Sequence, residues 1–216
     1  ISVTEENYLK AIFSVAQQPE TRVGNQLIAE HLAINPASVT EMLRKLDDKG
    51  LIEYSRASGA KLTRRGLKAA IKVIRKHRLW ETFLVEHLNF TWDEVHEVAE
   101  QLEHIKSDKL LDELDNFLGN PGFDPHGDPI PNKKGIMPVI KSRILSVADL
   151  GKRVKVVKVE DNSPSFLKYL DNQGIALSDI IHIKEVQDFD YSLLVEVKGK
   201  RDIYLSAEAA RKIMVQ

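Results

Sequence analysis

Apolar residues recur at helical spacing along the first 50 residues of the chain. The pattern predicts an amphipathic helix over residues 4 to 17, with Thr4 and Glu6 or Asn7 in capping range. After the turn QQPETRVGN, it predicts a short second helix over QLIAEHLAI. Asn35 is expected to cap a third helix, PASVTEMLRKLDDKG, which begins at Pro36 and ends at Gly50. Two short β-prone runs, LIEYS and KLTRRG, then predict a hairpin. Two helices joined by a tight turn and followed by a hairpin predict a winged helix-turn-helix.

Helical spacing continues over the middle of the chain. We expect one long helix from Thr63 to Leu88 and a second from about Trp92 to Leu118. The second helix carries more apolar positions than one core stripe needs, and this surplus predicts a dimer surface. Gly119 ends the helix, and the Pro/Gly-rich run NPGFDPHGDPIPNKKG that follows is typical of a linker.

Beyond Met137 the pattern changes from helical spacing to the alternation of strands. The runs RILSVADL, KRVKVVKVE, DIIHIKEV and SLLVEVKG are rich in β-branched residues, and one helix-like piece, SPSFLKYLDNQG, lies between them. With the closing run RDIYLSAEAARKIMVQ, these pieces predict a small, partly open β-barrel of roughly 75 residues. The fold class is therefore expected to be mainly α with a small β module.

Charge is distributed unevenly in a chain whose formal net charge is only −1. From Ser55 to Trp80 there are nine Lys or Arg residues and no acidic residue. From Glu81 to Asp128 there are thirteen Asp or Glu residues, two Lys, no Arg, and four of the seven His. The basic stretch suits the phosphate backbone of nucleic acid, whereas the acidic stretch costs repulsion unless a cation offsets it.

The segment VHEVAEQLEH places nitrogen and oxygen donors on one side of its helix. At about 100° per residue, four donor side chains fall within roughly a third of the circumference: His96, Glu100, Glu103 and His104. Upstream, His77 and Glu81 stand one helical turn apart. Taken singly, each of these residues is more simply explained as part of a solvated charged face. Taken together, they form a donor set that suits a divalent transition metal.

Several classes of protein are not expected. The chain contains no cysteine, which excludes disulfides and thiolate metal sites and fits a reducing cytoplasm. No apolar run approaches the roughly 18 residues that span a bilayer, and the start ISVTEENYLK does not have the pattern of a secretory signal. The sequence has no nucleophile elbow, no phosphate-cradling glycine loop and no internal repeat. We therefore expect a cytoplasmic protein that is not an enzyme and binds neither a membrane nor an organic small-molecule substrate.

On a winged helix, side chains at the start of the third helix meet base edges, while basic residues of the wing and the next helix meet phosphates. The small or hydrogen-bonding candidates for base contact are Asn35, Ala37, Ser38, Thr40 and Glu41. The basic candidates are Arg44, Arg56, Lys61, Arg64 and Arg65. A helical packing unit without DNA would share the same pattern, but the acid-free basic stretch favours double-stranded DNA as the partner.

The order of these features resembles the iron- and manganese-dependent repressors of the diphtheria toxin repressor family. The resemblance rests on the winged helix, KHRLWE, VHEVAEQLEH followed by SD, the DPHGDPIP linker and the terminal β module, and it covers essentially the whole chain. It implies a homodimeric bacterial repressor of manganese or iron homeostasis that binds a palindromic operator with a divalent metal as co-repressor. It also implies a winged helix-turn-helix domain at 1–72, a helical metal-binding and dimerisation domain with its linker at 73–140, and an SH3-like β domain at 141–216.

Carried over residue by residue, the resemblance implies two metal sites. The residues that match the primary positions are Glu100, Glu103 and His104. Asn7 stands where relatives have methionine or aspartate, so the N-terminal ligand here would be a neutral amide oxygen. The ancillary positions and the linker are matched by His77, Glu81, His96, Asp124 and His126, with Glu160 or Asp161 from the β module as a further candidate. The position of Glu100 is cysteine in the iron-type branch, so a carboxylate there resembles the manganese-type branch. Oxygen and nitrogen donors without sulfur suit Mn²⁺ or Fe²⁺. The general order of affinity among divalent metals would still let Zn²⁺ or Cu²⁺ substitute in vitro.

Two other functions fit parts of the pattern. Carboxylate and histidine helices also build di-iron metalloenzymes, although those bundles use Glu-x-x-His pairs on two helices and only Asp93 to His96 comes close here. A winged-helix repressor that senses an organic ligand would leave the acidic stretch as plain surface. Gel shifts with and without Mn²⁺ after chelation separate these alternatives.

Overall fold

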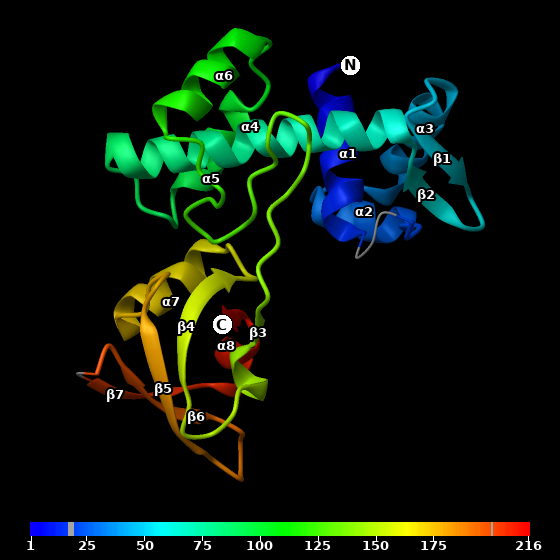
Figure 1. The fold of residues 1–216 in the computed structure, drawn as a ribbon. Helices are drawn as coiled ribbons and strands as arrows, with labels where there is room; N and C mark the ends of the chain where they lie inside the picture. Colours follow the sequence, from blue (N-terminus) through cyan, green and yellow to red (C-terminus); the bar gives the residue numbers. More distant parts are fainter. Residues whose placement is uncertain (17–19, 200) are drawn as a thin grey trace. The chain divides into compact units, whose positions relative to one another are not determined.

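The structure is a computed structural model that describes residues 1–16, 20–199 and 201–216 (Figure 1). It divides into two compact units, residues 1–77 with 100–108 and 131–136, and residues 78–99 with 109–130 and 137–216. Residues 17–19 of the predicted turn over QQPETRVGN lie outside the described residues. No helix within the described residues is both long enough and apolar enough to cross a membrane.

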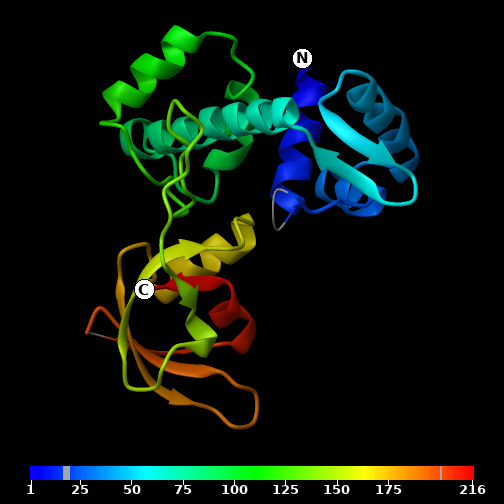
Figure 2. The ribbon, with the colours of Figure 1, turned by 45° about the vertical axis from the view of Figure 1, so that its right-hand side comes forward.

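The first unit contains the predicted winged helix-turn-helix. Its elements are α1 (Val3–Val15), α2 (Asn25–His31), α3 (Pro36–Asp48), β1 (Ile52–Ser55), β2 (Gly59–Leu62) and the start of α4 (Arg64–Leu88). Asn35 caps α3, because its side chain accepts a hydrogen bond of 2.9 Å from the backbone N–H of Ala37. The two strands pair antiparallel from Ile52 opposite Leu62 to Ser55 opposite Gly59. In Figure 2 this hairpin, in cyan, leads from α3 to the start of α4.

A single apolar core holds the three helices and the hairpin together. Its largest fully buried side chains come from every one of these elements: Leu9, Ile12, Ile28, Leu43, Leu46 and Ile52. The cap of α1 differs from the prediction, because Ser2 and Glu5 form a capping box and the helix begins before Thr4. Ser2 can do this because its hydroxyl and its own N–H both find a partner in the first turn.

The predicted helix from Trp92 to Leu118 is wrong, because the segment forms two helices, α5 (Val95–Leu102) and α6 (Asp108–Phe117). Glu103 and His104 lie in the turn that follows α5. Within that turn, the N–H of Ile105 donates to the carbonyl of Leu102, a closer partner than an α-helix uses. Ser107 followed by Asp108 is a pair that favours the start of a new helix. The break lets Glu103 turn into the interior, where it is 1% exposed.

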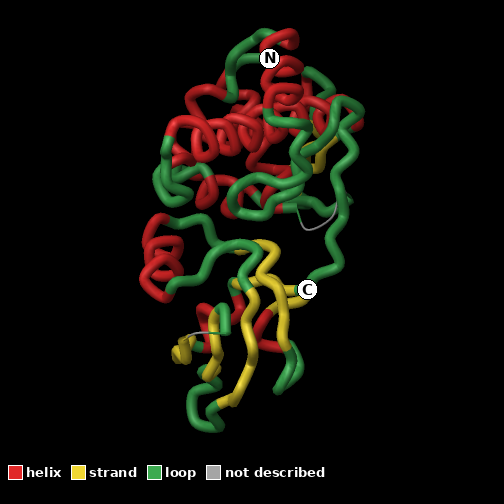
Figure 3. The backbone as a smooth tube through the Cα atoms, turned by 60° about the vertical axis from the view of Figure 1, so that its left-hand side comes forward, coloured by secondary structure: helices red, strands yellow, loops and turns green. Residues whose placement is uncertain are grey.

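The second unit contains the predicted β module. Its elements are β3 (Arg143–Ile144), the short helix η1 (Leu145–Val147), β4 (Arg153–Val159), α7 (Pro164–Gln173), β5 (Ile180–Val186), β6 (Leu193–Val197), β7 (Arg201–Leu205), α8 (Ala207–Arg211) and β8 (Ile213–Val215). The six strands form one antiparallel sheet in the order β3-β8-β4-β5-β6-β7. Register shifts in the β4–β8 and β5–β6 pairs bend the sheet around its core. Figure 3 shows these strands in yellow.

Candidate metal centres and nucleic-acid interface

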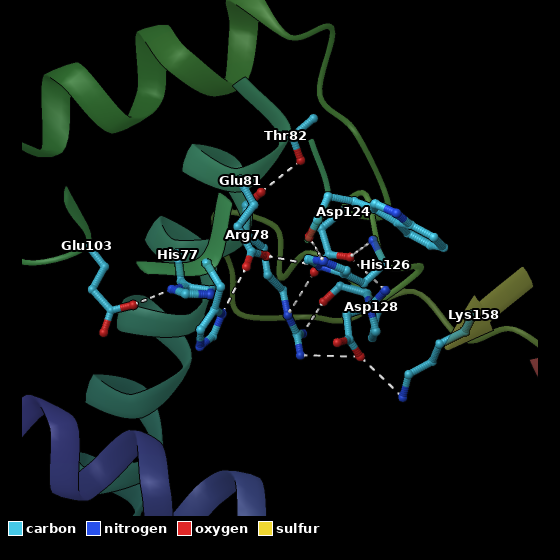
Figure 4. A network of polar contacts seen from close by, with 12 residues as sticks. His77, Arg78, Glu81, Thr82, Glu103, Asp124, His126, Asp128 and Lys158 are labelled. Atoms are coloured by element: carbon cyan, nitrogen blue, oxygen red, sulfur yellow. Dashed lines mark hydrogen bonds and ion pairs between the residues drawn. The ribbon is translucent and has the colours of Figure 1, made fainter. Parts of the chain in front are cut away.

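The first cluster of predicted ligands surrounds Glu103 in the first unit. We call it the Glu103 cluster; its members are Glu6 and Lys10 of α1, His77 of α4, Glu100 of α5, and Glu103 and His104 of the following turn. Oε2 of Glu103 lies 2.6 Å from Nδ1 of His77 and 2.7 Å from Nζ of Lys10 (Figure 4 shows the contact with His77). Burial alone would raise the pKa of Glu103, but the hydrogen bond from His77 and the charges of Lys10 and His77 outweigh it and lower the pKa.

His104 connects this cluster to α1 through a carboxylate. Its Nδ1 lies 2.6 Å from Oε2 of Glu6, and its Nε2 lies 3.6 Å from Oε1 of Glu103. The residue of α1 that contacts His104 is thus Glu6, whereas the resemblance implied its neighbour Asn7, which is half-buried on the same helix. Carboxylate, imidazole and amide oxygen are together suited to a divalent cation such as Mn²⁺.

The second cluster lies in the second unit around Glu81. We call it the Glu81 cluster; its members are Glu81, His96, Asp124 and His126. Ligand atoms of Glu81, Asp124 and His126 lie within 4.8 Å of one another, and all three residues are buried. Nδ1 of His96 lies 3.2 Å from Oε1 of Glu81, and Nδ1 of His126 lies 3.7 Å from Oε2. Figure 4 shows Asp124 and His126, from the linker, beside Glu81 of α4. His77 stands one helical turn before Glu81 on α4.

His126 is oriented as a metal ligand would be. Its Nε2–H donates to the backbone carbonyl of Trp92 at 2.8 Å, so in the neutral ring Nδ1 carries the lone pair. That Nδ1 is buried and has no hydrogen-bond partner among the described residues. Burial would lower the pKa of His126, but Glu81 and Asp124 outweigh it and raise the pKa. An orphaned nitrogen that faces two carboxylates fits a cation.

The charge around Asp124 is only partly offset. Burial, followed by the charges of Glu81 and Asp128, raises the pKa of Asp124 to about 7. Nε of Arg78 lies 3.5 Å from Asp124, and Nη2 of Arg78 lies 3.6 Å from Asp128, which also pairs with Lys158 at 3.2 Å (Figure 4). A buried group of carboxylates of this kind is stabilised by a cation.

The linker that carries this cluster is bonded to the β module. The N–H of Val159 donates to the carbonyl of His126 at 3.0 Å. Gly127 has φ +86°, and a Cβ there would lie 2.2 Å from the carbonyl oxygen of Val157, so no larger residue fits. Asp161, the candidate ligand from the β module, instead accepts from Lys212 and from the backbone of Ser163.

The candidate DNA-contacting residues are mostly exposed in the first unit. The exposed ones are Asn35, Ala37, Ser38, Glu41, Arg44, Arg56, Arg64 and Arg65. Two others have internal partners: the hydroxyl of Thr40 accepts from Asn25 at 3.0 Å, and Lys61 pairs with Glu20. Because Thr40 is half-buried and bonded, Ser38 and Glu41 are better placed for base contact than Thr40.

Sequence reasoning missed the residues that balance the ligands. Glu6 and Lys10 flank Asn7 on one helix, and Arg78 directly follows His77. Helical spacing places Glu6 and Lys10 on one face of α1, beside Asn7, but it does not indicate that this face meets Glu103 and His104.

Comparison with known proteins gives three family matches in the same order along the chain. They are "Iron dependent repressor, N-terminal DNA binding domain" over residues 1–60, "Iron dependent repressor, metal binding and dimerisation domain" over residues 63–132, and "FeoA domain" over residues 144–216. Each match covers one section of the chain, and together they leave only short connecting segments.

Individual relatives agree with these matches. The iron-dependent repressor IdeR of Mycobacterium leprae is 32% identical over 161 residues, which is 74% of this chain and 68% of that protein. The diphtheria toxin repressor of Corynebacterium diphtheriae is 25% identical over 99% of this chain and 96% of its own length. Among solved structures, a manganese-dependent transcriptional repressor in complex with manganese superimposes with a TM-score of 0.89 at 34% identity, covering 98% of this chain and 99% of that chain.

Proposed function

The chain belongs to the diphtheria toxin repressor family of metal-dependent transcriptional repressors, and from this premise we propose that divalent manganese or iron is its co-repressor in metal homeostasis. Members of this family are DNA-binding proteins and not enzymes, so the metalloenzyme alternative is set aside. The observation that carries the proposal is the Glu103 cluster, in which α1 of the DNA-binding region meets Glu103 and His104. An ion held there would connect the winged helix to the segment that follows α5.

The primary site of the proposal consists of Asn7, Glu100, Glu103 and His104. Glu103 and His104 would hold the ion from the turn after α5, Glu100 from the exposed end of α5, and Asn7 from α1. A divalent ion held there would supply two positive charges in a place where carboxylates gather. A state of the protein in which all four residues reach the ion binds it more tightly, so the ion favours that state over the others.

The second site of the proposal is the Glu81 cluster, and His77 stays a further proposed metal ligand. Its support is the buried Nδ1 of His126, which forms no hydrogen bond among the described residues and lies 3.7 Å from Oε2 of Glu81. Asp161 stays a candidate from the β module whose carboxylate would have to exchange its bond with Lys212 for the ion. A site of this composition stabilises the folded protein by an amount that grows with metal concentration over the dissociation constant.

Manganese and iron are both supported as the physiological metal. The M. leprae relative is described as iron-dependent, and the similar solved structure is a manganese-dependent repressor. Glu100 supplies oxygen where the iron-type branch has sulfur, and this favours Mn²⁺ as the harder ion. Zn²⁺ is expected to bind the same residues in vitro because it stands higher in the general order of affinity.

We further propose a homodimer that binds a palindromic operator in the cytoplasm. The match to a dimerisation domain over residues 63–132 supports self-association. On α4 and α6 three apolar side chains are exposed, Leu88, Leu110 and Phe117, as expected for a surface that a second copy covers. A two-fold symmetric dimer presents two winged helices, which matches the symmetry of a palindrome.

Gel shifts after chelation test the proposal. Wild-type protein treated with a chelator should bind operator duplex weakly, and added Mn²⁺ or Fe²⁺ should restore binding. Glu103→Ala and His104→Ala should abolish the metal response, whereas Glu113→Ala, which removes an exposed carboxylate on α6, should leave it unchanged. If wild-type protein bound the duplex equally well with and without the chelator, the alternative of a winged-helix repressor that senses an organic ligand would be supported instead.

A further inference from the structure

Lys10 places its ammonium group among the proposed ligands of the primary site. Its Nζ lies 2.7 Å from Oε2 of Glu103, 3.1 Å from Nδ1 of His77 and 3.8 Å from Oε1 of Glu100. The side chain of Lys10 is 15% exposed and that of Glu103 is 1% exposed, so the contact between them is largely shielded from water. A charge-assisted bond in such a place is stronger than one at the surface.

The ammonium group and a metal ion need the same lone pairs. Oε2 of Glu103 already accepts from Lys10 and lies in hydrogen-bond contact with His77, which accounts for both of its lone pairs. A divalent ion that coordinated this oxygen would also stand within a few ångströms of a positive charge, and the repulsion would weaken its binding. Lys10 would therefore have to move away before Oε2 of Glu103 could bind a metal ion.

The same contact stabilises the metal-free protein. A buried carboxylate without a counter-charge is costly, and the pair with Lys10 offsets that cost for Glu103. Lys10 also ties α1 to the turn after α5, the two segments that the proposed ion would connect. In the absence of metal, the ammonium group thus neutralises the carboxylate as the ion would, with one positive charge in place of two.

We propose that Lys10 is a tethered cation that neutralises the Glu103 cluster in the metal-free protein, is displaced when the metal binds, and so sets the metal concentration at which the repressor responds. This inference rests on the primary site proposed above. It predicts two effects of opposite sign for the loss of Lys10: tighter binding of metal, and a less stable metal-free protein.

The test compares Lys10→Met with Lys72→Met in the full-length protein. Lys72 pairs with Asp108 at the surface of the same unit, so its loss changes the net charge equally but leaves the Glu103 cluster intact. Calorimetric titration with Mn²⁺ gives the affinity of each metal site. The primary site is identified as the one that is lost in Glu103→Ala. Thermal unfolding in excess chelator gives the stability of the metal-free protein.

Lys10→Met should bind Mn²⁺ about tenfold more tightly at this site or better, and should unfold at a lower temperature than wild type without metal. Lys72→Met should match wild type in both measurements. A variant that folds only when Mn²⁺ is present would also support the inference. If Lys10→Met failed to fold under both conditions, Lys10→Gln, which can still donate to Glu103 but carries no charge, should show the same two changes.

Equal or weaker Mn²⁺ binding in the folded variant would overturn the inference, and so would an unchanged unfolding temperature without metal. These failures differ from a failure of the proposed function. If wild type and Glu103→Ala bound the same number of Mn²⁺ ions, the primary site itself would be refuted and the role of Lys10 with it. If Glu103→Ala lost one ion while Lys10→Met behaved as wild type, only the inference would fall.

Discussion

Replacing Glu5 by Gln should destabilise the winged helix at neutral pH. Glu5 is 0% exposed, and its Oε1 accepts from Lys49, which directly follows α3, at 2.7 Å and pairs with Lys45 of α3 at 3.1 Å. Its Oε2 accepts from the N–H of Ser2 and completes the capping box of α1. Gln keeps the shape and one acceptor but removes the charge that holds two lysines, so the contact between α1 and α3 should weaken.

The magnitude follows from the pKa of the carboxyl group. The hydrogen bond with Lys49 is the largest cause that lowers the pKa of Glu5 from 4.5 to about 2, against the effect of burial. A shift of this size corresponds to at most about 3 kcal/mol of stability. Both lysines are about half exposed to water, which screens the pairs, so we expect about 2 kcal/mol or somewhat less.

The pH dependence has a definite sign. Because the folded protein holds the pKa below its unfolded value, the contribution of Glu5 is fully present above pH 4.5 and is lost as the pH falls toward about 2. Urea unfolding in excess chelator should show Glu5→Gln less stable than wild type at pH 7, with the gap narrowing below pH 4.5. Glu53→Gln, which removes a carboxylate paired with Arg22 at the surface, should change stability by less than about 0.5 kcal/mol. Equal stability of Glu5→Gln and wild type at pH 7, or a gap that persists undiminished toward pH 2, would refute this reasoning.

Three further predictions concern DNA, metal and the linker. Arg64→Ala should weaken binding to all duplexes about equally and reduce the slope of the logarithm of the binding constant against the logarithm of salt concentration by about one unit. Ser38→Ala should alter the base preference. A changed base preference in Arg64→Ala would contradict the assignment of Arg64 to phosphate contact. His126→Ala should bind fewer Mn²⁺ ions per subunit by titration, and retention of the wild-type number would mean that the linker donates no essential ligand. Gly127→Ala should lower the free energy of unfolding by about 2 kcal/mol or more, because φ is +86° and the added Cβ meets the carbonyl of Val157. Thermal unfolding measures this loss, and an unchanged midpoint temperature would show that the linker can move to make room for the methyl group.

The winged helix could be predicted from sequence because its signals are local. Asn35 and Pro36 mark the start of α3 through the chemistry of one turn, and the β-prone runs on either side of Gly59 mark the hairpin. The β module is similar, since alternation defines each strand without knowledge of its neighbours. The structure confirms these elements. They were predictable because each is specified by residues close together in the chain.

The break between α5 and α6 could not be predicted in the same way. Helical spacing continues across Glu103 and His104, so the pattern alone favours one helix. The turn is stabilised by partners from distant segments, since Glu103 bonds with Lys10 and His77, and His104 bonds with Glu6. Tertiary contacts of this kind override local propensity, and periodicity carries no information about them.

Candidate ligands and their counter-charges differ in how far a sequence can indicate them. A carboxylate or an imidazole is a donor wherever it stands, so Glu103 and His126 could be proposed from residue type and spacing. A counter-charge depends on which face meets the ligand in the fold, and nothing in the spacing of α1 indicates that Lys10 lies 2.7 Å from Glu103. Yet a buried carboxylate needs such a partner whenever the metal is absent. The affinity of a cation site is therefore set by two groups of residues, the donors and the charges that replace the ion, and only the first group can be identified from the sequence.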